Sequence, residues 1–237
     1  MKWDRVALIV LAEGEGDVSV QIDTEYFIRR YNIPPHLVVR INQPIQQFMF
    51  NRNGLTMAGE LAAMSGVFAG KLTGQSKIII TGHGDEPPHV SCSDLGAVLM
   101  SRLFKVLGVS DVGLISFKSC YTGQSTYLED LTAACKREGI RFGWCLAYIN
   151  WSGIATDLYC KKFYSRRQVV GFPDLLTYLI SCGFAKLPDS FRVRVVKGSL
   201  ELPPEFVKTL GPRFNSGITT PGHAASYSED VSDIFDI

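Results

Sequence analysis

The chain has 237 residues, of which 46% are hydrophobic and 20% are charged, a composition typical of a soluble protein with one full hydrophobic core. The formal net charge of +1 excludes a global electrostatic attraction to nucleic acid or to an anionic membrane. Any partner must therefore be recognised by a local site.

The N-terminal part of the chain predicts two strands before a first helix. Val6–Ala12 is apolar, too short to cross a bilayer and without a small-residue cleavage site, so it indicates a buried strand rather than a signal peptide. Val18–Ile22 alternates apolar and polar residues, which is typical of a half-exposed strand or hairpin arm. The next predicted elements are a helix from Asp23 or Thr24 to Arg30, a strand over 37–41 and a helix over 56–68.

Two later strands each lead into a glycine-containing turn that carries a reactive side chain. The run that starts at Lys77 ends in a turn with His83 and Gly84, and the run that starts at Asp111 ends in a turn with Cys120. The remaining predicted elements are strands over 141–148 and 191–196, a helix from Ser93 or Asp94 to Leu107, and helices over 125–137, 154–164 and 173–182. This alternation predicts a parallel sheet in a domain over 1–210, followed by a flexible tail over 211–237.

His83 and Cys120 form the candidate catalytic pair. Parallel strands end at the same edge of a sheet, where open α/β sheets bind ligands, so the two side chains are expected to lie together there. Cys120 would supply a thiolate and His83 a proton, while the N–H groups of Gly84 and Cys120 would form an oxyanion hole. The separation of 120 − 83 = 37 residues accommodates one loop, one helix and the next strand.

This order of motifs resembles the caspase-like clan of cysteine peptidases. Ser119-Cys120-Tyr121-Thr122-Gly123 is similar to the nucleophile turn of metacaspases, and the short loop from Val90 to Leu95 looks most like the autoprocessing domains of large toxins. The resemblance covers roughly residues 5 to 200 in the order of elements. It implies a caspase-like three-layer sandwich around a mostly parallel sheet of about six strands. It also implies an endopeptidase that acts on protein or peptide substrates, with self-processing as one such reaction, in the manner of a bacterial effector or toxin protease.

The resemblance places the substrate pocket in the loop after the strand over 141–148. Trp151 and Ser152 are the candidate residues of its wall, and Asp85 or Asp157 would be the carboxylate if the enzyme cleaves after a basic residue. The matching loop has no arginine of the kind that caspases use to bind aspartate. The sequence therefore argues against an aspartate preference and leaves apolar and basic residues open.

Metal and cofactor requirements follow from the cysteines and the basic residues. The six cysteines show no CxxC spacing, which argues against zinc and indicates a reducing location, either the cytoplasm or the cytosol of a host cell. No cofactor is needed for the chemistry. The toxin domains bind inositol hexakisphosphate as an activator, and by that resemblance two basic clusters are candidates for such a site, although a solvated helix face and a charged edge strand are the favoured interpretation. The clusters are Lys161, Lys162, Arg166 and Arg167, and Arg192, Arg194 and Lys197.

Two other functions stay open at this stage. The first is a caspase-like module without activity that acts as a binding or scaffold protein, and the second is another α/β enzyme, such as an acyltransferase, that uses the same thiol. Glu13 and Asp17 form an acidic patch that would suit calcium, although exposure to solvent explains it more simply. The sequence sets no oligomeric state.

Overall fold

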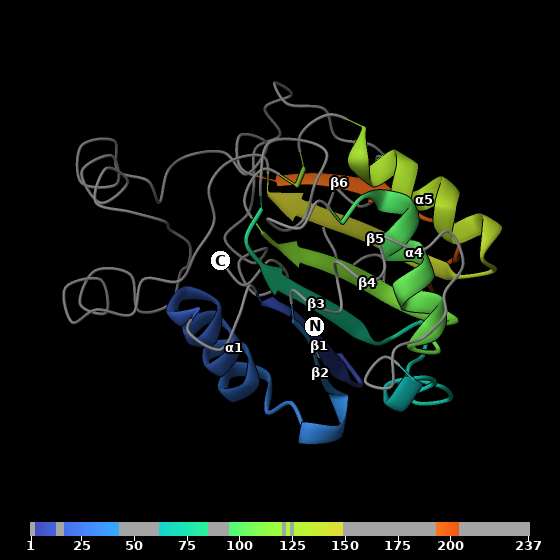
Figure 1. The fold of residues 1–237 in the computed structure, drawn as a ribbon. Coiled ribbons are helices and arrows are strands. Elements are labelled where there is room, and N and C mark those ends of the chain that lie inside the picture. The colour runs from blue at the N-terminus through green and yellow to red at the C-terminus, as the bar shows by residue number, and fades with distance from the viewer. Residues whose placement is uncertain are drawn as a thin grey trace.

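The computed structural model describes residues 3–12, 17–42, 62–84, 95–119, 122–123, 126–148 and 193–203. These residues form one six-stranded sheet with the strand order β2-β1-β3-β4-β5-β6 (Figure 1). Neighbouring strands are parallel except for β6, which pairs with β5 in the antiparallel sense at the edge. The predicted α/β class with a mostly parallel sheet of six strands is confirmed.

The bounds of the elements agree with most of the predicted strands. The strands are β1 (Val6–Ala12), β2 (Val38–Asn42), β3 (Lys77–Gly82), β4 (Asp111–Lys118), β5 (Arg141–Tyr148) and β6 (Val193–Lys197). The helices are α1 (Val18–Tyr31), α4 (Ala97–Val106) and α5 (Tyr127–Arg137), with a 3-10 turn over Pro35–Leu37. The predicted helices over 154–164 and 173–182, and the tail over 211–237, lie outside the described residues.

The predicted strand over Val18–Ile22 is wrong, because these residues form the start of α1. The side chain of Asp17 caps the helix by accepting a hydrogen bond from the Val20 N–H over 3.2 Å. Val20, Thr24 and Phe27 are buried and recur at helical spacing, so they form the face of α1 that packs on the sheet. The helix ends at Asn32, whose φ of 50° lies in the left-handed region.

Helices cover both faces of the sheet. Lys77 of β3 contacts Tyr31 of α1, whereas Phe117 of β4 packs edge-to-face on Tyr127 of α5, with ring centroids 5.7 Å apart. Phe117 lies beside Ile80 in the register of β3 and β4, three residues along the strand from Lys77. Because successive strand residues point to opposite faces, α1 and α5 lie on opposite sides of the sheet.

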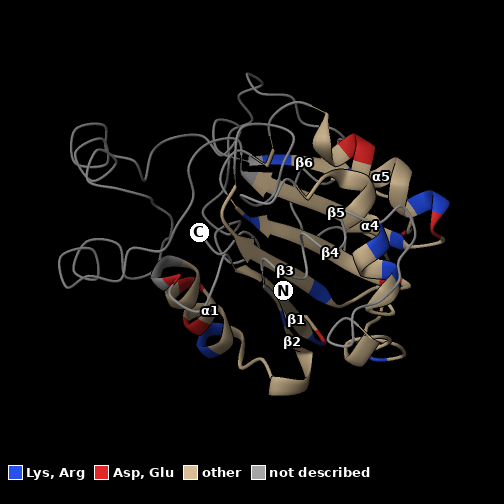
Figure 2. Cartoon of the chain, viewed as in Figure 1, with Lys and Arg blue, Asp and Glu red and all other residues tan. Residues whose placement is uncertain are grey.

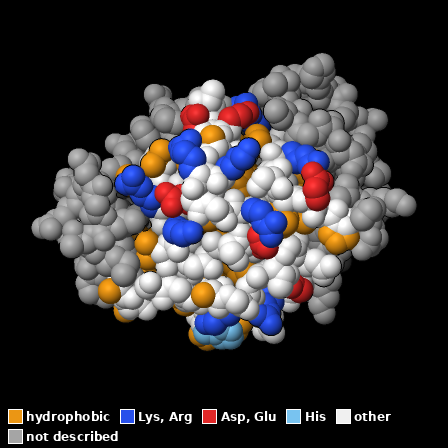
Figure 3. Space-filling model, turned by 90° about the vertical axis from the view of Figure 1, so that its right-hand side faces the viewer, with side chains coloured by type: hydrophobic (Ala, Val, Ile, Leu, Met, Phe, Trp, Pro, Cys, Tyr) orange, Lys and Arg blue, Asp and Glu red, His pale blue; other side chains and the backbone are white. Residues whose placement is uncertain are grey.

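The starts of the strands lie at the opposite edge from the candidate site. Figure 3 shows this side of the molecule, where basic and acidic side chains are interspersed. Arg141 binds both carboxylate oxygens of Asp111 there, at 2.8 and 2.7 Å, and both residues stand at the first position of their strands. This pair joins β4 to β5 in the exposed rim.

Candidate active site

The site is built where β3 and β4 end side by side. The two strands are parallel neighbours, and their last pair in register is Thr81 with Lys118. His83 follows Thr81 by two positions, and Ser119 continues from β4 as a buried residue. The predicted nucleophile Cys120 lies outside the described residues.

Gly82, the last residue of β3, fixes the path of the backbone directly before His83. A Cβ atom at residue 82 would lie 2.6 Å from the carbonyl oxygen of Leu11 in the neighbouring strand β1. Only glycine permits so close an approach between the two backbones. The glycine thus keeps the end of β3 paired with β1 up to the residue that precedes His83.

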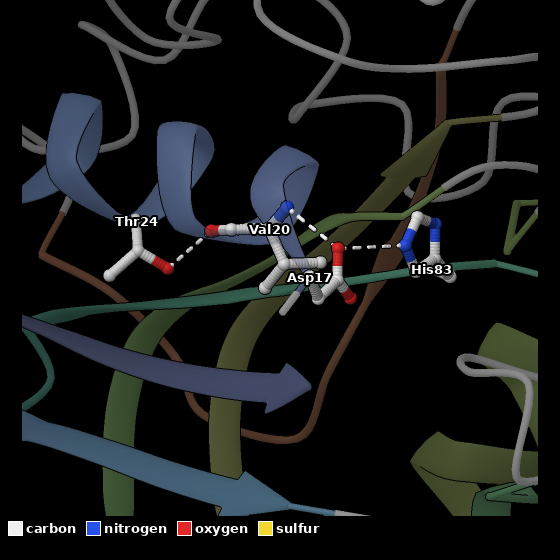
Figure 4. Close-up of polar contacts among 4 residues, drawn as sticks. All are labelled: Asp17, Val20, Thr24 and His83. Atoms are coloured by element: carbon white, nitrogen blue, oxygen red, sulfur yellow. Dashed lines mark hydrogen bonds and ion pairs between the residues drawn. The ribbon is translucent and has the colours of Figure 1, made fainter. Parts of the chain in front are cut away.

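A hydrogen bond joins His83 to Asp17, the residue that caps α1. His83 Nε2 lies 3.1 Å from Asp17 Oδ1, and the same oxygen accepts the Val20 N–H (Figure 4). The Asp17 side chain is 8% exposed and the His83 side chain 44%, so the carboxylate is shielded while the imidazole reaches solvent. The contact connects residues that are 66 positions apart in the chain.

This contact fixes the tautomer of His83. An ionised carboxylate only accepts hydrogen bonds, so Nε2 carries the hydrogen and donates it to Asp17. The lone pair of the neutral ring is then on Nδ1, which lies on the far side of the ring from Asp17 in Figure 4. An imidazole held in this way is oriented to exchange a proton through Nδ1.

The first turn of α1 supports the carboxylate in turn. The hydroxyl of Thr24, one helical turn further along α1, donates over 2.6 Å to the carbonyl of Val20, the residue whose N–H binds Asp17. Asp17 appeared in the sequence only as part of an acidic patch, so its role at His83 was not predicted. The signal that was available was an aspartate at the N-cap position of an amphipathic helix.

The other predicted site residues are placed only in part. Gly84, the predicted oxyanion-hole residue, follows His83 and is half-buried. The predicted substrate-binding residues Asp85, Trp151 and Ser152 lie outside the described residues. The same holds for Asp157, Glu13 and the basic residues at 161, 162, 166, 167 and 192.

Arg194 and Lys197, which were grouped as part of one basic cluster, do not share a face of β6. Arg194 pairs in register with Ala147 and through it with Phe117, on the α5 side of the sheet. Lys197 pairs with Trp144 on the opposite side and forms an ion pair with Glu201 at 3.2 Å. The position of β6 at the edge of the sheet agrees with the interpretation of a charged edge strand.

Two of the other cysteines are described, and both are buried free thiols, Cys135 on α5 and Cys145 on β5. Burial, with a smaller contribution from Glu138, raises the pKa of Cys135 to about 12. Burial also raises the pKa of Cys145 well above its ordinary value, with smaller contributions from Cys135 and Glu129. Neither thiol is therefore suited to nucleophilic chemistry near neutral pH.

Within the described part of the chain, no three His, Cys, Asp or Glu side chains are grouped as metal ligands would be. No helix among these residues is long and apolar enough to cross a membrane. Comparisons with protein-family models, with curated proteins and with solved structures found no match. The local geometry of the site is therefore the basis for assigning a function.

Proposed function

We propose that the protein is a cysteine endopeptidase of the caspase-like type, with Cys120 as nucleophile and His83 as general acid and base. The single observation that carries this proposal is the hydrogen bond between His83 and the shielded carboxylate of Asp17 at the carboxyl edge of the sheet. A histidine with one ring nitrogen bound by a buried acid is arranged as in triads that activate a nucleophile.

The strand register supports the choice of Cys120. Thr81 of β3 is paired with Lys118 of β4, an offset of 118 − 81 = 37 positions. His83 and Cys120 are separated by the same offset, 120 − 83 = 37. Each lies two positions along the chain from its member of this register pair, and the ends of the two strands lie side by side at one edge of the sheet.

The architecture is compatible with a caspase-like sandwich. Five parallel strands, one antiparallel edge strand and helices on both faces match the arrangement that this resemblance implies. The proposed reaction is the hydrolysis of a peptide bond in a protein or peptide substrate.

The proposed mechanism assigns one role to each side chain. Nδ1 of His83 accepts the proton of the Cys120 thiol, and the sulfur attacks the substrate carbonyl carbon. The resulting imidazolium, stabilised by Asp17, returns the proton to the leaving amine as the C–N bond breaks. Water then hydrolyses the thioester with His83 as base. This step releases the peptide fragment that carries the new carboxyl group and restores the Cys120 thiol.

The test uses the full chain with a mixed peptide library and with the protein itself as substrate, read by mass spectrometry. The wild type is expected to produce defined cleavage products, which Cys120→Ala and His83→Ala abolish. Cleavage that persists in Cys120→Ala, or a wild type that cleaves nothing while Cys120 reacts slowly with iodoacetamide, would contradict the proposal. The second result would favour a binding module without activity.

A further inference from the structure

An ion pair between β6 and α5 lies close to the end of β4. The guanidinium of Arg194, in β6, contacts the Oε1 atom of Glu129, in the first turn of α5. The side chains are 14% and 32% exposed, so solvent screens the two charges only in part. Figure 2 shows basic positions on β6 and acidic positions on α5.

Arg194 is the described cation that offsets the negative charge of Glu129. Its second oxygen, Oε2, is buried and has no hydrogen-bond partner in the described part of the chain. Among the described residues, Arg194 is the cation that contacts this carboxylate, and its positive charge offsets the negative charge of Glu129.

The helix that carries Glu129 begins beside the end of β4, and it follows the proposed nucleophile turn in the chain. Tyr127 is the first residue of α5 and packs on Phe117, the residue before the last in β4. The N-terminus of α5 is thus held against the end of the strand from which the chain continues through Ser119 toward Cys120. The positive end of a helix favours a nearby thiolate, whereas a carboxylate in its first turn opposes that effect.

The charge of Glu129 already acts on a thiol of this fold. Burial, the neighbouring Cys135 and the Glu129 carboxylate together raise the pKa of Cys145. The elements packed around the ion pair contribute further ionisable groups, and the exposed Asp130 lies in the same helical turn. These groups are Tyr127 and Cys135 on α5, Cys145 on β5, Asp111 and Lys118 on β4, and Arg102 and Lys105 on α4.

We propose that Arg194 is a positioning residue that binds Glu129 and so keeps the N-terminus of α5 favourable to the Cys120 thiolate. The inference rests on the proposed function, because it concerns the reactivity of the same nucleophile. It assigns to the edge strand β6 a role in the electrostatics of the site. The same pair connects β6, which follows the predicted pocket segment in the chain, to α5, which follows Cys120 in the chain.

The experiment measures the rate of Cys120 alkylation by iodoacetamide between pH 5 and 9, with peptide mapping to identify the modified cysteine. Arg194→Met is expected to move the midpoint of the profile to higher pH and to slow the reaction about threefold at pH 6.5. Glu129→Gln is expected to move the midpoint to lower pH and to accelerate the reaction by a similar factor. The double variant should return to the wild-type profile, and Arg194→Lys should retain it.

Two matched variants serve as controls. Asp130→Asn removes an exposed acid from the same turn of α5, and Arg141→Met removes an arginine from the exposed pair at the opposite edge of the sheet. Both should leave the midpoint unchanged, because water screens these charges.

Opposite shifts in Arg194→Met and Glu129→Gln are the signature of a charge effect. A purely structural contact would give shifts of the same sign, or lower thermal stability with an unchanged midpoint, and either result would overturn the inference. If the wild-type Cys120 reacts no faster than the buried Cys135, the proposed function itself fails. Fast wild-type alkylation with unchanged midpoints in the variants would overturn this inference alone.

Discussion

Lys77 Nζ donates a hydrogen bond to Tyr31 Oη over 3.0 Å from a position that is fully buried between β3 and α1. The ammonium also lies 4.7 Å from the centroid of the Tyr31 ring. Burial, followed by the positive charges of Lys118 and Arg30, holds the pKa of Lys77 well below its ordinary value. The folded state therefore releases this proton at a lower pH than the unfolded chain does.

The first prediction concerns stability against pH. Between the lowered pKa of folded Lys77 and the ordinary value near 10.5, the unfolded chain binds more protons, so the free energy of unfolding should rise with pH. The slope from this one group reaches about 1.4 kcal/mol per pH unit within that window. Urea unfolding at pH 7 and pH 9.5 measures the change, which Lys77→Met should reduce. Lys136→Met, at an exposed site on α5, should behave as the wild type does.

The second prediction separates the two roles of Asp17. Asn is also a good N-cap, so Asp17→Asn should keep the free energy of unfolding within about 0.5 kcal/mol of the wild type. It should lower kcat/KM for peptide cleavage about 100-fold, because the imidazolium loses its anionic partner. Asp17→Ala should lose the same activity and, in addition, about 1 kcal/mol of stability.

A spectroscopic measurement checks the same contact without an activity assay. Nitrogen chemical shifts of the histidine side chains should show the Nε2–H tautomer at His83 in the wild type and a mixture of tautomers in Asp17→Ala. A single Nδ1–H tautomer in the wild type would contradict the contact.

The third prediction concerns the close approach of β3 and β1. Gly82→Ala places a methyl group 2.6 Å from the Leu11 carbonyl oxygen, so the strands must separate locally. The expected loss is about 1–3 kcal/mol in the free energy of unfolding, together with the loss of cleavage activity as His83 is displaced. Gly96→Ala is the control, since no atom lies within 4 Å of a Cβ there. This variant should lower the free energy of unfolding by less than about 1 kcal/mol and leave the cleavage activity intact. Equal losses in both variants would contradict the steric argument.

The fourth prediction concerns thiol selectivity. At pH 7 a limiting amount of iodoacetamide should modify Cys120 first and leave Cys135 and Cys145 unmodified, because burial keeps the pKa of Cys135 near 12 and that of Cys145 well above its ordinary value. Peptide mapping identifies the modified residue. In urea all six cysteines of the chain should react at similar rates. Modification of Cys145 before Cys120 in the folded protein would contradict this assignment.

The interior strands could be predicted because they are fully buried and therefore consist of continuous apolar residues. Ile78, Ile79 and Ile80 are fully buried, and such a continuous apolar run between turn residues is the mark of a parallel strand. The strand prediction for Val18–Ile22 was wrong because the apolar residues of this region fit both the two-residue period of a strand and the 3.6-residue period of a helix. Its alternation suits a strand, while Val20, Thr24 and Phe27 suit a helix, and the cap at Asp17 decides between them.

The candidate site was predictable only as far as its strand ends. His83 follows a strong strand signal, so its place at the carboxyl edge could be predicted. Its bond to Asp17 depends on β1 lying beside β3, a strand order that no local spacing encodes. Similarly, the alternation in β6 indicates which residues share a face with Arg194, but the sequence does not show that this face turns toward α5.

The single oxygen of Asp17 that serves both Val20 and His83 gives the site a built-in reporter. Whenever that carboxylate swings away, the amide of Val20 loses its acceptor and becomes open to deuterium from the solvent. The hydrogen–deuterium exchange rate of the Val20 amide therefore reports how often the hydrogen bond between Asp17 and His83 opens.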